Sequence, residues 1–204
     1  MSRETVEVRV LHPCEEFLNH GISLHAFLTE IELACSSSGV SLSEREIDHV
    51  CYRVETKVDY QRIYSRLSSM GSVLAETMIG GRPIATFSLT NPIEYKNWMI
   101  PCIELPCPKE SSFYTEGWEH CEVVIGNASM DAVDNREFLE HFVSAHSHLS
   151  FDMRSVGKEI NADVSLNING DFSVKFHSRP LYEVCLFEKS HGLCIPVPED
   201  YFKS

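Results

Sequence analysis

Three histidines and one glutamate stand at matching places in two similar parts of this chain, where they could bind a metal ion. His49 lies near the start of the strand-like run IDHVCYRV, and His120 lies near the start of GWEHCEVVI. Glu104 and His177 follow them at nearly equal distances, in later strand-like runs. Imidazole nitrogens and carboxylates suit a borderline divalent ion such as Zn, Ni, Fe, Co or Mn. Three imidazoles and one carboxylate would leave about two octahedral positions for water or substrate.

Alternate side chains of a strand face one side, which places further charged residues beside the predicted ligands. Glu122 shares a face with His120, where it could serve as a general base or pair with a neighbouring cation. Arg53 and Lys175 share faces with the predicted ligands of their own strands. Both could hold a carboxylate or phosphate of a substrate, and exposed charges at strand ends are the competing interpretation.

The elements that would position these residues occur twice in the same order. Both halves read as strand, helix, strand, strand, strand, with a polar linker over 109–116 between them. The first half predicts a helix over 56–71 and strands over 46–54, 72–79, 84–91 and 98–106. The second half predicts a helix over 134–149, which Asp134 or Asn135 could cap, and strands over 117–126, 162–168 and 172–177. A further strand near 153–160 is poorly defined.

Two such halves predict an α+β fold in which paired βαβββ modules form a curved mixed sheet around a cleft. We expect a helical extension over 1–45, a first module over 46–108, a second module over 117–188 and a tail over 189–204. Apolar residues recur at helical spacing over 10–38, where Gly21 could split the helix in two. The run LYEVCLFEK at 181–189 could form a closing helix.

The composition limits the partners of the chain. A formal net charge of −13 argues against a surface for nucleic acid or anionic membranes, since both need clustered Lys and Arg. No apolar run approaches the roughly 20 residues that span a bilayer, and residues 1–10 lack the apolar core of a signal peptide. The eight cysteines form no CxxC pair and mostly have apolar neighbours, which is typical of reduced, buried thiols in a cytoplasmic protein.

Five runs carry a resemblance to a known family. DHVCYRV, ETMIGGRPI, IELPCP, GWEHCEVVI and VKFH resemble the small bacterial YecM-type proteins of the vicinal oxygen chelate superfamily, which includes glyoxalase I and the extradiol dioxygenases. The resemblance covers most of residues 40–188, and it implies a divalent metal held by His49, Glu104, His120 and His177. Glyoxalase-type members carry a glutamate where His177 stands, so a second carboxylate could come from Glu183 or Glu122.

The functional expectation is a metal-binding protein related to isomerases, lyases and oxidoreductases. Its metal would chelate a small, oxygen-rich substrate and stabilise an enolate-like anion, and isomerase, lyase and dioxygenase chemistry all stay open. A non-catalytic module for a metal or a small anion is the alternative, and histidines that only hydrogen-bond within the core are a third. We expect a monomer or homodimer in the cytoplasm, with no nucleic-acid or membrane partner.

Overall fold

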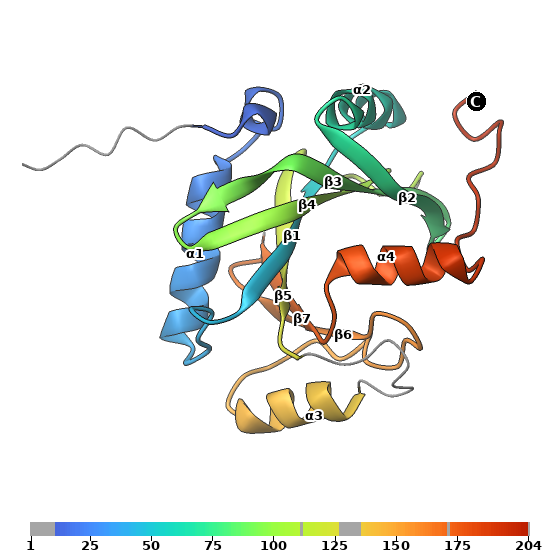
Figure 1. Ribbon diagram of the computed structural model, residues 1–204. Coiled ribbons are helices and arrows are strands. Elements are labelled where there is room, and N and C mark those ends of the chain that lie inside the picture. The colour runs from blue at the N-terminus through green and yellow to red at the C-terminus, as the bar shows by residue number, and fades with distance from the viewer. Residues whose placement is uncertain (1–10, 111, 127–135, 171, 204) are drawn as a thin grey trace, which may run out of the picture.

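The computed structural model describes residues 11–110, 112–126, 136–170 and 172–203, which form one sheet flanked by helices (Figure 1). The strands are β1 (Glu46–Arg53), β2 (Gly71–Ile79), β3 (Arg82–Tyr95), β4 (Trp98–Pro106), β5 (Gly117–Val124), β6 (Asp163–Asn167) and β7 (Ser173–His177). The helices are η1 (Pro13–Glu16, a 3-10 turn), α1 (Leu24–Ser37), α2 (Lys57–Ser68), α3 (Arg136–Ala145) and α4 (Leu181–Ser190). The helix cap predicted at Asp134 or Asn135 lies outside the described residues.

The seven strands form one mixed sheet in the order β2-β3-β4-β1-β5-β7-β6. In each half the first strand runs parallel to the last one, β1 beside β4 and β5 beside β7. The central pair, β1 and β5, is antiparallel and joins the halves. This arrangement relates them by a pseudo-twofold axis between β1 and β5, and it confirms the predicted α+β fold with a mixed sheet. The exact module boundaries stay a prediction.

The second half is smaller than predicted because the expected strand near 153–160 is reduced to a single bridge between Asp152 and Ser165. The strand does not continue beyond this bridge, because the backbone N–H and the guanidinium of Arg154 both donate to the Asp152 carboxylate. A side chain that binds the backbone two residues later favours a turn over a strand. The first half keeps all of its predicted strands.

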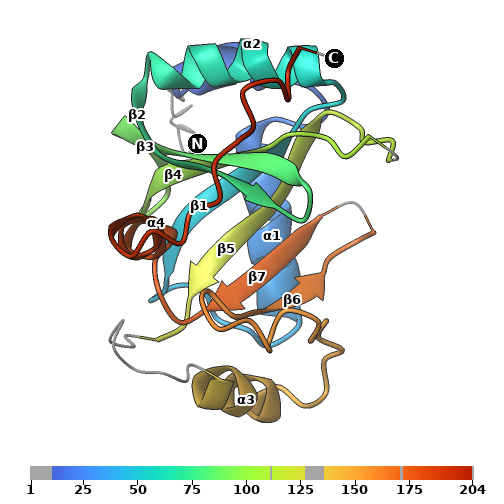
Figure 2. The same cartoon turned by 90° about the vertical axis from the view of Figure 1, so that its right-hand side faces the viewer.

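Helices cover both faces of the sheet (Figure 2). The predicted break at Gly21 is confirmed, since its φ of +72° suits glycine, and the Ser23 hydroxyl caps α1 by accepting from the Ala26 N–H. On that side Phe27 of α1 packs on Trp118 and Phe172. The predicted closing helix is α4, and it packs on the opposite face.

Helix α4 lies between the two halves of the curved sheet (Figure 1). Leu181, Val184 and Cys185 of α4 pack against Leu74 of β2 and Cys102 of β4. The Leu181 N–H donates to the Asp48 carboxylate of β1 at 2.6 Å, which fixes the start of the helix. The helix therefore covers part of the face on which the predicted site residues lie.

All eight cysteines carry free thiols, and all except the half-buried Cys194 are buried, as their apolar neighbours predicted. Burial raises the pKa of the Cys35 thiol to about 12, which favours the neutral form. None of the described helices is long and apolar enough to cross a bilayer.

Candidate metal centre

Two acid–histidine dipeptides, Asp48-His49 in β1 and Glu119-His120 in β5, form the frame of the candidate site. The pairing of these strands shifts register between Ile47 and His49, so Asp48 is an extra residue in β1. It shifts again where Cys51 and Tyr52 of β1 meet His120 and Trp118, so Glu119 is the extra residue in β5. Such β-bulges re-aim side chains, and here the acid and the next histidine face the same cluster.

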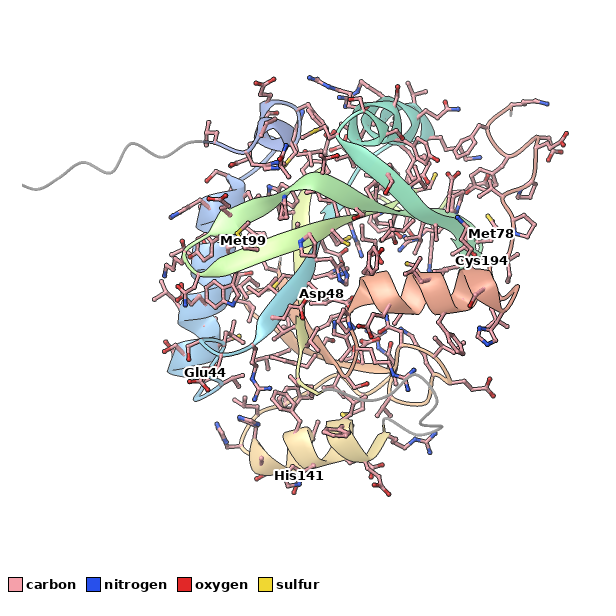
Figure 3. All side chains as sticks on the ribbon, viewed as in Figure 1. Glu44, Asp48, Met78, Met99, His141 and Cys194 are labelled. Carbon is pink, nitrogen blue, oxygen red and sulfur yellow. The ribbon has the colours of Figure 1, made fainter. Side chains whose placement is uncertain are left out.

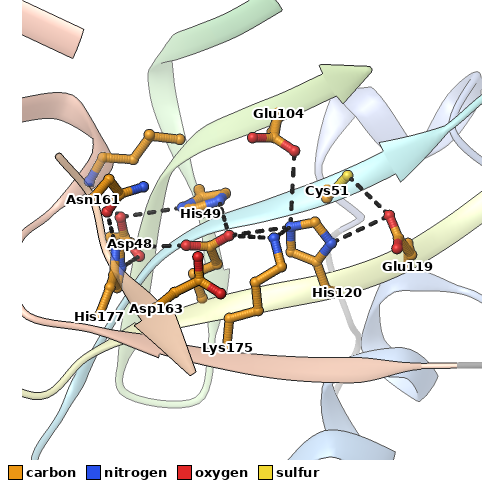
Figure 4. Close-up of polar contacts among 12 residues, drawn as sticks. Asp48, His49, Cys51, Glu104, Glu119, His120, Asn161, Asp163, Lys175 and His177 are labelled. Atoms are coloured by element: carbon orange, nitrogen blue, oxygen red, sulfur yellow. Dashed lines mark hydrogen bonds and ion pairs between the residues drawn. The ribbon is translucent and has the colours of Figure 1, made fainter. Parts of the chain in front are cut away.

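Each acid lies beside the Nδ1 atom of its own histidine, and the contact of Asp48 with His49 is a hydrogen bond, whereas that of Glu119 with His120 is an ion-pair contact. An Asp48 oxygen lies 3.2 Å from Nδ1 of His49, and a Glu119 oxygen lies 3.2 Å from Nδ1 of His120 (Figure 4). A carboxylate at one ring nitrogen fixes the ring and leaves the other nitrogen to act as a ligand, which is the usual arrangement of metal-bound histidines. Both Nε2 atoms point to the space between β1 and β5.

Glu122 occupies the centre of the cluster. Its Oε1 lies 3.5 Å from Nε2 of His49 and 3.3 Å from Nε2 of His120. Nitrogen and oxygen ligands at about 2.0–2.1 Å from a tetrahedral metal lie about 3.3–3.4 Å from one another, so this spacing fits one ion. Within the described part of the chain, His49 Nε2 and Glu122 Oε2 are buried without a hydrogen-bond partner. The three side chains can therefore hold a divalent metal.

Glu104 stands beside this group, with its Oε1 3.8 Å from Nε2 of His120. It is half-buried, whereas His49 and His120 are buried. The predicted ligand Glu104 is thus close enough to supply a fourth donor after a small rotation of its side chain.

His177 belongs to the same cluster but faces other partners. Its Nε2 lies 3.0 Å from an Asp48 oxygen, its Nδ1 lies 2.9 Å from the Asn161 side-chain oxygen, and it stands 3.5 Å from Glu122. Both ring nitrogens therefore already have an oxygen partner. The role of His177 as a direct ligand stays a prediction.

The strand register shows which residue of the second half stands at the position equivalent to Glu104, and this residue is not His177. In the first half Cys51 of β1 pairs with Glu104 of β4, and in the second half Glu122 of β5 pairs with Lys175 of β7. Cys51 and Glu122 correspond to each other, since each lies two residues after its site histidine. Lys175, two residues before His177, is therefore the counterpart of Glu104.

The cluster is a network of opposite charges. Burial alone would lower the pKa of His49, but Asp48 and Glu122 outweigh it and raise that pKa to about 10. Burial would raise the pKa of Glu122, but Lys175 and His49 hold it well below its ordinary value. A metal at His49 Nε2 would therefore compete with a proton for that nitrogen.

Arg53 and Glu119 form the solvent side of the cluster. The Arg53 guanidinium pairs with Glu119 and lies 4.6 Å from the centre of the Tyr114 ring. A hollow of about 430 Å³ opens beside them, with Trp118 in its wall. Arg53 and Glu119 line this hollow, whereas His49, His120, Glu122 and Glu104 do not.

Glu183 lies elsewhere, exposed on α4, where its charge acts on Glu46. Among the described residues it makes no contact with the histidine cluster. Glu122 rather than Glu183 therefore brings the second carboxylate to the site.

One known protein family matches most of this chain. The family model described as YecM protein matches residues 18–188 of this chain. The chain belongs to the YecM family. Protein YecM of Escherichia coli (strain K12) is 30% identical over 111 residues, which cover 54% of this chain and 59% of that protein. An uncharacterized protein of Haemophilus influenzae is 32% identical over 102 residues, which cover 50% of this chain and 53% of that protein.

This YecM family member thus aligns with less than two thirds of the length of those curated relatives. A solved structure named Structural Genomics, Protein EC4020 superposes with a TM-score of 0.66 at 24% identity. That superposition covers 80% of this chain and 87% of the other, which shows a shared fold.

Two carboxylates of the site, Asp48 and Glu119, do not follow from strand alternation. Strict alternation would turn each of them away from its histidine neighbour, and only the bulges bring them back. One signal in the sequence of this YecM family member could have found them. An acidic residue directly precedes the site histidine in both repeats, as Asp-His in the first and Glu-His in the second.

Proposed function

We propose that this chain binds one divalent transition metal between β1 and β5 through His49, His120 and Glu122, with Glu104 as a fourth donor. The supporting observation is that Nε2 of His49 and Nε2 of His120 both lie at ligand spacing from Glu122 Oε1, with a carboxylate beside Nδ1 of each imidazole. Zn, Ni, Fe, Co and Mn all suit this donor set. His177 supports it through Asp48.

The leading function is a metal-dependent enzyme for a small, oxygen-rich substrate, in the manner of the vicinal oxygen chelate superfamily. When bound, the metal would polarise two neighbouring oxygens of the substrate and stabilise an enolate-like anion. Arg53, at the wall of the hollow, would orient a carboxylate or phosphate of that substrate. Isomerase, lyase and dioxygenase chemistry fit this arrangement equally.

Glu122 acts as a ligand rather than as the general base in this proposal. It is surrounded by His49, His120 and Lys175, and its pKa lies well below the ordinary value. A carboxylate stabilised in its charged form is a weak proton acceptor, because an efficient base has a pKa near the working pH. Glu104, at the solvent edge of the cluster, is better placed to meet a substrate.

A non-catalytic module that holds a metal or a small anion is the second candidate. Burial favours it: His49 and His177 are fully buried, and α4 covers part of the same face of the sheet. A site closed in this way would retain its ion but exchange ligands slowly. The partly exposed side chains of Glu104, Glu119 and Lys175 on the other side of the cluster favour the enzyme instead.

Elemental analysis of the purified protein tests the metal proposal. We expect about one equivalent of a transition metal, lost in a His49→Ala/His120→Ala double variant. The matched control is His141→Ala/His191→Ala, which removes two exposed imidazoles; His141 points outward from α3 (Figure 3). Wild-type protein without metal, even after reconstitution with each of the five ions, would refute the proposal.

A cobalt-loaded sample separates the two candidates. Oxalate is a small anion with two neighbouring oxygens, and its binding to open positions on cobalt would change the visible absorption spectrum. Such a change, absent in an Arg53→Ala variant at the same oxalate concentration, would support the enzyme. An unchanged spectrum at saturating oxalate would support the non-catalytic module.

A further inference from the structure

Lys175 places a positive charge on the same atoms that would hold the metal. Its Nζ donates to Glu122 Oε1 at 2.7 Å and lies 3.0 Å from Nε2 of His120 (Figure 4). Both atoms are donors in the proposed site. An ammonium and a divalent ion cannot both occupy this position, because their charges repel at such short range.

The pseudo-twofold axis shows how unusual this residue is. The axis relates Lys175 to Glu104, so the two halves present an ammonium and a carboxylate at equivalent places. Within the cluster the Lys175 ammonium pairs with the Glu122 carboxylate at 2.7 Å, at the centre of the proposed donor set.

We infer that Lys175 is the resident cation of the metal-free site and competes with the metal for His120 and Glu122. The inference rests on the proposed metal function and adds to it that Lys175 sets the affinity. Its ammonium balances the central carboxylate and prevents Glu122 from being buried with an uncompensated charge. The site would otherwise have to be stabilised by metal alone.

The structure offers the ammonium a place to go when the metal enters. A quarter of the Lys175 side chain, 25%, is exposed, and the charges of Glu104 on β4 and Asp163 on β6 act on it. Lysine has four side-chain bonds that rotate, so release needs no movement of β7. Metal binding and exposure of Lys175 are thus one coupled event.

Zinc titration of the metal-free protein against a chromophoric chelator tests the competition. Lys175→Met removes the charge but keeps the length, and we expect zinc to bind at least about tenfold more tightly. Lys175→Glu places a carboxylate at the position equivalent to Glu104, and this variant should bind zinc more tightly still. Lys189→Met is the matched control, since it removes an exposed lysine from the end of α4 and should leave affinity unchanged.

Amine labelling of the wild type gives a second readout that does not depend on any variant folding. An acylating reagent, followed by mass spectrometry, should modify Lys175 slowly without zinc and several times faster with saturating zinc. Lys189 should react equally in both samples.

The outcomes separate the inference from the proposed function. Equal or weaker zinc affinity in folded Lys175→Met, or Lys175 labelling that saturating zinc leaves unchanged, would overturn the inference while the metal site stands. If no zinc binds to the wild type or to either Lys175 variant, the metal proposal itself fails and the inference falls with it.

Discussion

The dipeptides Asp48-His49 and Glu119-His120 each lie at a β-bulge, and each has a carboxylate-to-Nδ1 distance of 3.2 Å. Their surroundings differ. The Asp48 side chain is 2% exposed, whereas that of Glu119 is 23% exposed. Asp48 also contacts His177 and the first N–H of α4, while Glu119 pairs with Arg53 at the edge of a hollow. Equivalent positions in the two halves thus carry different tasks.

Because of this difference, two repeats of the same fold form a site with one buried side and one partly exposed side. The first pair is tied to the core and to α4, so it fixes the position of His49. The second pair lies among groups that can move, Arg53, Lys175 and Glu104, each with an exposed part. Ligand exchange would take place on the second side, against a rigid first side.

The largest effect expected from this comparison is on stability. Asp48→Ala removes the partner of His49, of His177 and of the Leu181 N–H, and loss of one member of a buried charge network costs about 3–5 kcal/mol. Glu119→Ala removes a partly exposed acid and should cost only about 0–1 kcal/mol. Urea unfolding of the metal-free proteins measures both free energies. Equal losses would show that the two halves are not divided into a rigid and an open side.

The next effect is on metal affinity. Glu119→Gln keeps the shape of the side chain but weakens its hold on Nδ1 of His120, and such changes behind a ligand lower affinity by about 10–100-fold. Zinc titration against a chelator measures the change, and urea unfolding should show little loss of stability. Glu110→Gln, at an exposed acid paired with Lys57, is the matched control. Unchanged affinity in Glu119→Gln would mean that this carboxylate does not orient a metal ligand.

The strands were readable from the sequence wherever alternation and turns decide the structure. The range 98–106, for example, is the observed β4, and the tail run at 181–189 became α4. The same alternation, repeated in both halves, predicts that His49 and His120 lie close together between the two repeats. The strand at 153–160 was not, because Asp152 and Arg154 close a local turn that competes with the sheet.

The acids of the site depend on pairing across the sheet, which single strands do not reveal. Alternation within β1 assigns Asp48 to the wrong face, and only the register shift against β5 corrects it. Distance along the chain predicts His177 as the counterpart of Glu104, whereas the β5–β7 register selects Lys175. A shift of two residues keeps the face of the strand, so the periodic pattern could not distinguish the two.

The smallest effect expected concerns Asn161, which contacts Nδ1 of His177, while Asp48 contacts its Nε2. Its φ of +51° lies in the left-handed region, and its side-chain oxygen lies 2.9 Å from His177 Nδ1. Asn161→Gly removes the hydrogen bond and also the Cβ that asparagine carries at this φ, so we expect a loss of about 1 kcal/mol or less. Asn161→Ala should lose about 1 kcal/mol more than Asn161→Gly, because alanine keeps a Cβ but lacks the polar side chain that lets asparagine adopt this φ. Urea unfolding of both variants beside Asp48→Ala separates the hydrogen bond from the strain. A loss in Asn161→Gly as large as in Asp48→Ala would place the rigid anchor of His177 at Asn161 and reverse the assignment of the two sides.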